Sequence, residues 1–341
     1  MKNKSLEQIA ASIVAPDKGI LAADESSPTI KKRFDSINAE STEKNRRDYR
    51  DMLFKTKNIS QYISGVILFH ETIYQKDSNG KPLVEVLTDQ GIVPGIKVDK
   101  GAKPLAGHPN ETITEGLDGL RERLDEYSKA GAQFTKWRAV ISIANSIPSN
   151  YCIQANAHAL ARYASLSQEA GLVPIIEPEV LMDGTHNIDE CYRVTESVLT
   201  EVYAQLADSK VELKGTLLKP NMIISGKSAV NRATPEEVAQ ATVSCFQNTV
   251  PSAVPGIVFL SGGQSDNEAT VNLDAINRQA KETGAPWQLS FSYGRGLQSA
   301  PLNAWRGKKD NMAKAQNVFF QRALLTSAAR NGAYDIGMEA V

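Results

Sequence analysis

The sequence predicts an α/β protein: a (β/α)8 or TIM barrel with extra peripheral helices, formed by residues 1–341 as a single domain. Eight short apolar or β-branched runs recur along the chain, and amphipathic stretches of helical length separate them. Strands that alternate with helices form parallel sheets, and eight such units close into a barrel. The alternative is an open doubly wound sheet, which usually carries a G-x-G-x-x-G turn after its first strand. The first run, GILAADESS, has no such turn.

The strands and helices can be assigned in order. We expect strands at 19–24, 63–69, 94–99, 134–143, 172–180, 215–220, 256–262 and 288–294. We expect helices at 117–130, 153–170, 234–245 and 313–329. The helix at 234–245 opens with Thr-Pro-Glu-Glu, which is typical of an N-cap followed by proline and acids. The charged segment 33–60 is longer than one crossover helix requires, so it predicts extra helices outside the barrel.

Composition and charge narrow the class of partner. The net charge of −1 gives no reason to expect a nucleic acid or a membrane surface as partner. The N-terminal stretch lacks the apolar run of a signal peptide, and no run of about 18 apolar residues follows it. Cys152, Cys191 and Cys245 share no C-x-x-C spacing, which favours free thiols in a reducing compartment. The sequence therefore predicts a cytoplasmic protein.

Ionisable residues stand at or just beyond the ends of six predicted strands, where barrel strands are normally apolar. They are Asp24, Lys97, Lys136, Arg138, Glu177, Glu179, Lys219 and Arg295. Each one alone could reach solvent, and mutually paired charges could be purely structural. Unpaired charges in such positions are costly, and active sites in this fold lie at the mouth formed by the C-terminal strand ends. The set as a whole therefore favours a site.

Lysine decides the chemistry that we expect there. A lysine amine attacks a carbonyl only when it is unprotonated, which desolvation or neighbouring cations promote. Lys219 ends the apolar run Gly-Thr-Leu-Leu, and Lys136 and Arg138 supply cationic neighbours. Glu177 and Glu179 supply the proton transfer that carbinolamine formation and dehydration require. Together these residues predict Schiff-base chemistry on a carbonyl compound.

Two glycine-containing loops point to phosphate. The segments 260–265 (LSGGQS) and 291–296 (FSYGRG) follow the seventh and eighth predicted strands. Loops at this position commonly form the phosphate site of such barrels, through backbone N–H groups and a bidentate arginine. A lone Ser-Gly-Gly is more often a turn, but the pair with Arg295 attached favours a phosphate site.

Several of these segments resemble the class I fructose-bisphosphate aldolases. The matching motifs are AADES (22–26), KNRRDYR (44–50), GIKVDKG (95–101), KWR (136–138), IIEPEV (175–180), LLKPNM (217–222), FLSGGQS (259–265) and SYGRGLQ (292–298). The likeness runs in order from about Ser5 to Tyr334. It implies reversible cleavage of fructose 1,6-bisphosphate to dihydroxyacetone phosphate and glyceraldehyde 3-phosphate, without metal or cofactor, by a homotetramer acting on sugar phosphates.

The resemblance also implies a role for each matching residue. Lys219 would form the Schiff base, and Glu177 would be the acid/base for its formation and hydrolysis. Glu179 would hydrogen-bond Lys219, while Asp24 would bind substrate hydroxyls and help to cleave the C3–C4 bond. Lys136 would help to keep the amine unprotonated. The residues implied to bind substrate are Arg138, Ser261, Gly262, Gly263, Ser292, Gly294 and Arg295, with Arg33, Lys97 and Ser26 toward the second phosphate and Arg46 near the site.

The sequence departs from the family pattern at two places. Ser27-Pro28-Thr29 stands where animal members carry Thr-Gly-Ser, beside the second phosphate. The chain also ends without the longer tyrosine-terminated tail of many eukaryotic members, and we expect Tyr334 to pack on the last helix. Deleting residues 335–341 should then change turnover little.

Competing readings lead to different chemistry. Another Schiff-base barrel enzyme, such as a transaldolase or a deoxyribose-phosphate type aldolase, would use a single phosphate or a different sugar. A zinc-dependent aldolase needs clustered histidines, whereas His70, His108, His158 and His186 include no two at ligand spacing. A non-catalytic scaffold would leave the internal lysines and glutamates unexplained.

Overall fold

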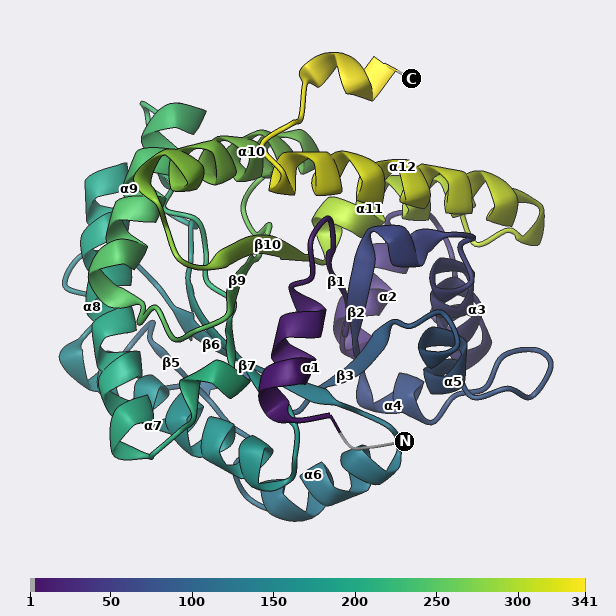
Figure 1. Ribbon diagram of the computed structural model, residues 1–341, viewed down its shortest axis with the longest axis horizontal. Helices are drawn as coiled ribbons and strands as arrows, with labels where there is room; N and C mark the ends of the chain where they lie inside the picture. Colours follow the sequence, from purple (N-terminus) through teal and green to yellow (C-terminus); the bar gives the residue numbers. More distant parts are fainter. Residues whose placement is uncertain (1–3, 341) are drawn as a thin grey trace.

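The predicted barrel is present in the computed structural model, which describes residues 4–340 (Figure 1). Eight parallel strands close on themselves in the order β1-β10-β9-β8-β7-β6-β3-β2, so strands that follow one another along the barrel sequence are neighbours in space. The barrel strands are β1 (Gly19–Ala23), β2 (Ile63–Leu68), β3 (Val93–Lys97), β6 (Phe134–Ile141), β7 (Val173–Val180), β8 (Leu217–Leu218), β9 (Gly256–Phe259) and β10 (Gln288–Tyr293). Each of them lies within one of the eight predicted segments or begins one residue before it.

Helices surround the barrel, as Figure 1 shows for α7, α8, α9 and α10 on one side and for the α2, α3 and α5 group on the other. The helices after the first are α2 (Ser27–Asp35), α3 (Glu43–Phe54), α4 (His70–Ile73), α5 (Leu83–Thr88), α6 (Leu120–Lys129), α7 (Asn150–Glu169), α8 (Ile188–Asp208), α9 (Pro235–Thr249), α10 (Asp266–Thr283), α11 (Arg295–Trp305) and α12 (Met312–Arg330). The expectation of extra helices within 33–60 is confirmed by α3, which contacts α5 and α12. Within residues 4–340, none of the helices is both long enough and apolar enough to cross a bilayer.

Local chemistry explains where the helices begin. Helix α9 starts with a capping box, in which Thr234 accepts from the Glu237 N–H and the Glu237 side chain accepts from the Thr234 N–H. Helix α7 starts earlier than predicted because Ser149 caps it through the Cys152 N–H. Helix α6 starts later than predicted because Gly119 adopts a left-handed conformation, with φ of 62°.

Helices α4, α5, α8, α10 and α11 were not assigned individually in the sequence, and one hairpin was not predicted at all. Strands β4 (Ala102–Pro104) and β5 (Thr112–Thr114) form an antiparallel hairpin between β3 and α6. Each strand has three residues, which is too short to produce a recognisable alternation in the sequence.

The barrel interior is filled from its N-terminal end. Helix α1 (Leu6–Ile13) lies across that end (Figure 1) and inserts Ile9, Ala10 and Ile13 into an apolar cluster. The strands contribute inward side chains to the same cluster: Ile20, Ala22, Ile67, Val93, Phe134, Val173, Ile175, Leu217 and Val258. Because these apolar side chains fill the interior on this side, the ionisable side chains of the strands lie toward the C-terminal strand ends.

Candidate active site

Side chains two residues apart on a strand point to the same side. Residues that follow an inward-pointing apolar residue by two or four positions therefore also point into the barrel, nearer its mouth. Ile175 points inward in the apolar cluster, so Glu177 and Glu179 point inward above it. By the same alternation Lys219 points inward above Leu217, and Asp24 points inward above Ala22. These ionisable side chains line a pocket of about 320 Å³ at the C-terminal ends of the strands.

Most of the predicted site residues line this one pocket. They are Asp24, Ser26, Arg33, Lys97, Lys136, Arg138, Glu177, Glu179, Lys219, Ser261, Gly262, Ser292, Gly294 and Arg295. They come from all the barrel strands except β2 and from the loops beyond those strands, so only closure of the barrel brings them together.

A buried network of two lysines and two carboxylates forms the centre of the pocket. Lys219 Nζ lies 3.1 Å from Glu177 Oε1, and Lys136 Nζ lies 3.3 Å from Glu177 Oε2. Lys136 Nζ is also 2.7 Å from Asp24 Oδ2. Each of these side chains except Asp24 is at most 5% exposed, so the charges are neutralised by one another rather than by water.

The network shifts the ionisation of its members. Burial would raise the pKa of Asp24, but the positive charges of Lys136 and Lys219 outweigh it and hold that pKa well below its usual range. The same opposition between burial and the two lysines lowers the pKa of Glu177. Burial would lower the pKa of Lys136, but Asp24 and Glu177 hold it above its usual value. Asp24 and Glu177 are therefore carboxylates at neutral pH, and Lys136 is an ammonium.

The two predicted phosphate loops meet at the rim. Helix α11 begins at Arg295, and the N–H groups of its first turn have no carbonyl acceptor within the helix. These N–H groups face the region of Ser261 and Gly262. The Gly296 N–H donates to Ser261 Oγ at 3.3 Å, which ties the two loops together. Ser292 Oγ is buried and has no hydrogen-bond partner among the described residues. Donors from both loops thus converge on one place, as an oxyanion site requires.

The comparisons with known proteins identify the family. The model of the family described as fructose-bisphosphate aldolase class-I matches residues 5–340. The chain belongs to the class I fructose-bisphosphate aldolase family. It is similar to a probable fructose-bisphosphate aldolase class 1 of Xanthomonas axonopodis pv. citri, at 55% identity over 95% of this chain and 96% of that protein. It is also similar to the cytosolic fructose-bisphosphate aldolase 4 of Arabidopsis thaliana, at 55% identity over 95% of this chain and 82% of the relative.

A solved structure supports the same assignment. The ternary co-crystal structure of fructose-bisphosphate aldolase from Plasmodium falciparum, in complex with TRAP and a small-molecule inhibitor, matches with a TM-score of 0.94. That match has 50% sequence identity and covers 97% of this chain and 95% of the other. Enzymes of this class are metal-independent lyases that act through a lysine Schiff base, which removes the zinc-dependent alternative for this aldolase.

One contact predicted for the aldolase differs in the structure, so that prediction was wrong. Glu179 was expected to hydrogen-bond Lys219, but its carboxylate accepts from Arg138 Nε instead. The register between β7 and β8 gives the reason: Ile176 pairs with Leu218, which puts Lys219 opposite Glu177. Glu179 lies two residues nearer the mouth, about 6.6 Å further along the strand, and there it meets Arg138.

Two predicted binding residues do not line the pocket. Arg46 donates to the Glu71 carboxylate and to the Ser41 carbonyl, so its guanidinium is held outside the pocket by helix α4. Gly263 has a φ of 77°, and a Cβ there would overlap Met182, so this glycine serves the turn. The geometry does not support a substrate contact by the Arg46 side chain.

Two pocket residues were missed in the sequence. Asp99 accepts from Lys97 Nζ at 2.6 Å and from the Gly101 N–H at 3.0 Å. The alternation that placed Lys97 at the mouth also applies to Asp99, two residues on, so the sequence contained the signal. Glu25 follows Asp24 directly and lies on the opposite side of the strand, where no sequence periodicity indicates a ligand.

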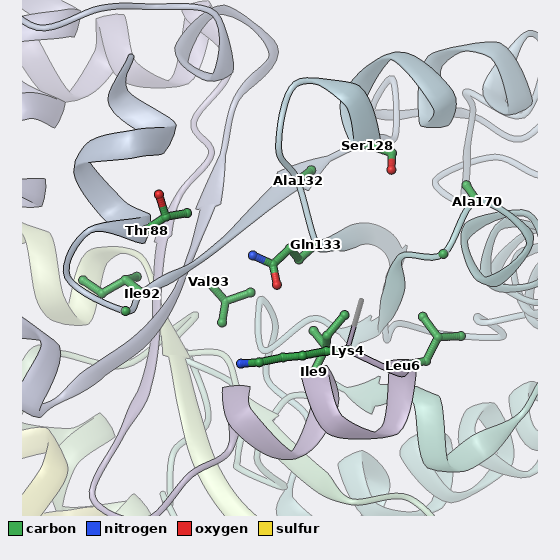
Figure 2. Close-up of a pocket in the computed structure, with 12 residues that line it drawn as sticks. Lys4, Leu6, Ile9, Thr88, Ile92, Val93, Ser128, Ala132, Gln133 and Ala170 are labelled. Carbon is green, nitrogen blue, oxygen red and sulfur yellow. The ribbon is translucent and has the colours of Figure 1, made fainter. Parts of the chain in front are cut away.

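A second pocket lies at the other end of the barrel. It measures about 680 Å³ and lies between α1 and the turns that precede β3, β6 and β7 (Figure 2). Its polar side-chain atoms come from Lys4, Thr88, Ser128 and Gln133. It is larger than the pocket at the mouth, but it has no acid/base pair beside its single lysine, so chemistry rather than volume locates the active site. Among residues 4–340, no three His, Cys, Asp or Glu side chains come together in a way that could hold a metal ion.

Proposed function

We propose that Lys219 is the nucleophile with which this aldolase reversibly cleaves fructose 1,6-bisphosphate to dihydroxyacetone phosphate and glyceraldehyde 3-phosphate. The 3.1 Å contact between Lys219 Nζ and Glu177 Oε1 carries the proposal. Transfer of one proton across that contact produces a free amine and a carboxylic acid together. Those are the two groups that addition to a ketone and loss of water from the carbinolamine require.

The residues around Lys219 account for the steps that follow. The amine adds to the ketone carbon, Glu177 protonates the departing hydroxyl, and a protonated imine forms. Asp24, a carboxylate held 2.7 Å from Lys136, accepts the proton of the C4 hydroxyl, and the C3–C4 bonding electrons move into the imine. The aldehyde leaves, the resulting enamine takes a proton at C3, and water releases dihydroxyacetone phosphate from the lysine.

Two cationic regions of the pocket fit the two phosphates. We assign one phosphate to the loops of Ser261 and Arg295, where backbone N–H groups and a guanidinium converge. Lys97 lies on another part of the same pocket wall, with Ser26 before the start of α2, and Arg33 reaches from α2 to the edge of the first region beside Gly294. We assign the second phosphate to these three residues. The presence of Lys97 and Arg33 in addition to Arg295 favours a bisphosphate over a sugar with a single phosphate.

The test is covalent trapping. Borohydride added with dihydroxyacetone phosphate should reduce the imine and leave the adduct on the peptide that contains Lys219. Lys219→Arg should abolish the adduct, whereas Lys103→Arg should not, because Lys103 is exposed on β4 outside the pocket lining. An adduct mapped to a different lysine, or none at all in the wild-type protein, would overturn the assignment.

We also propose that the chain forms one domain, works in the cytoplasm and assembles as a homotetramer. The cytosolic name of the Arabidopsis relative and the burial of Cys152, Cys191 and Cys245 as free thiols support the location. The family resemblance supports the tetramer. Size-exclusion chromatography with light scattering should give a mass four times that of the chain; the mass of a monomer would contradict it.

A further inference from the structure

Glu25 is a buried carboxylate beside the catalytic strand end. It follows Asp24 directly after β1, and alternation turns it toward helices α2, α3 and α11 while Asp24 faces Lys136. The residue is 7% exposed. An acid buried this deeply is retained only with charged or hydrogen-bonding partners, so its partners indicate its role.

Those partners link three helices to the pocket. Glu25 Oε1 accepts from Arg33 Nη1 on α2 and, at 2.8 Å, from Gln298 Nε2 on α11. Gln298 Nε2 also donates to the Ala22 carbonyl at 2.7 Å, which fixes the amide against β1. Arg50 on α3 donates to the Glu25 carbonyl oxygen at 2.9 Å, and its guanidinium lies 3.9 Å from Glu25 Oε2. One carboxylate therefore lies between two guanidiniums and a fixed amide.

The free side of the Arg33 guanidinium faces the active site. Arg33 lines the pocket, and its Nη2 lies 3.5 Å from the position that a Cβ on Gly294 would occupy. Gly294 is the residue that caps helix α11 immediately before Arg295. Because a guanidinium is a planar fork, fixing Nη1 on Glu25 also fixes the direction of Nη2.

We propose that Glu25 is a positioning residue for substrate phosphate, acting through Arg33. It holds one edge of the Arg33 guanidinium so that the other edge presents its N–H groups to the ligand beside Gly294. The inference rests on the proposed function, because it assumes that Arg33 contacts a substrate phosphate. Glu25 belongs to the pocket lining, but we assign its carboxylate no contact with substrate, because Oε1 already accepts from Arg33 and Gln298 and Oε2 is buried.

The first test separates binding from chemistry. Glu25→Gln should raise the KM for fructose 1,6-bisphosphate and the inhibition constant of inorganic phosphate by about tenfold, the size of one charge-assisted hydrogen bond. The kcat should stay within about twofold, because the lysine–carboxylate network is untouched. Asp274→Asn is the matched control, since Asp274 is another buried acid paired with an arginine, Arg278, outside the pocket. It should leave both constants unchanged.

A double-mutant cycle then tests the route through Arg33. In an Arg33→Ala background, Glu25→Gln should have no further effect on KM. Arg33→Lys should match Glu25→Gln, because an ammonium cannot contact Glu25 and point into the pocket together. Arg33 is 21% exposed, so this variant tests the idea even where Glu25→Gln fails to fold.

Two results would overturn the inference: additive effects of the two substitutions on KM, or equal losses of kcat and kcat/KM in Glu25→Gln. Failure of the proposed function gives a different result, because the wild-type protein would then neither cleave fructose 1,6-bisphosphate nor be trapped by borohydride.

Discussion

Replacing Glu177 by glutamine tests the centre of the network. Glutamine preserves the size of the side chain and one acceptor oxygen, but it cannot take a proton from Lys219 across the 3.1 Å contact. General acid–base catalysis by a positioned group contributes about 10²- to 10⁴-fold. Glu177→Gln should therefore lower kcat by that factor, which corresponds to about 3–5 kcal/mol in the activation free energy.

The KM should change much less than kcat. Glu177 is 4% exposed and lies at the bottom of the pocket, whereas the expected phosphate contacts come from the loops of Ser261 and Arg295 at the rim. The assay is steady-state cleavage of fructose 1,6-bisphosphate, together with the rate of borohydride trapping by dihydroxyacetone phosphate. Both rates should fall in parallel if imine formation is the step affected.

The control for this prediction is Glu111→Gln. Glu111 is also a buried acid, but it accepts from the backbone and side chain of Ser149 outside the pocket. The Glu111→Gln enzyme should keep the wild-type kcat even if its free energy of unfolding falls. A Glu177→Gln enzyme with a kcat within about threefold of wild type would refute the reasoning, because it would lack the loss of at least about 10²-fold that removing an acid/base group produces.

Three further variants probe other parts of the structure. Arg295→Ala should raise KM at least about tenfold with a smaller change in kcat, since a phosphate grip acts in ground and transition states alike. The lowered pKa of Asp24 means that its carboxylate contributes fully to stability above the unfolded pKa of about 3.9, and that this contribution declines as pH falls from there toward the lower pKa of the folded state. The Tm difference between wild type and Asp24→Asn should therefore be larger at pH 7 than at pH 3, and an unchanged difference would contradict the pairing with Lys136. Glu339→Gln should lower the free energy of unfolding by about 1 kcal/mol without changing kcat, because Glu339 pairs with the largely buried Arg322 outside the pocket. A loss of kcat would show that the C-terminal segment contributes to turnover.

The fold could be predicted because periodicity is a local property. The eight strand segments and the helices at 117–130, 153–170, 234–245 and 313–329 were recognisable from spacing and capping residues alone. Boundaries were less predictable, because they depend on single caps and on backbone conformation. Gly119 shortened α6, and Ser149 lengthened α7. The β4–β5 hairpin depends on pairing between two segments, which no local pattern indicates.

The candidate site was predictable in its residues but not in its contacts. Charge at the ends of apolar strands, with the alternation along each strand, selected Asp24, Lys136, Glu177 and Lys219. Which oxygen meets which nitrogen depends on the register between strands, and that is a relation between distant parts of the chain. The partner of Glu179 was therefore wrong in the sequence-based prediction.

The sequence by itself thus determined the family, the barrel and the set of ionisable side chains at its mouth, because each follows from local pattern or from motif. Only the tertiary structure decided how those charges pair. The register of β7 against β8 places Glu177 opposite Lys219. The packing of α2, α3 and α11 against β1 places Glu25 between Arg33 and Arg50. Side-chain pairs of this kind form across helices and strands that are remote in sequence, so their distances are fixed by closure of the barrel and by helix packing rather than by neighbouring residues.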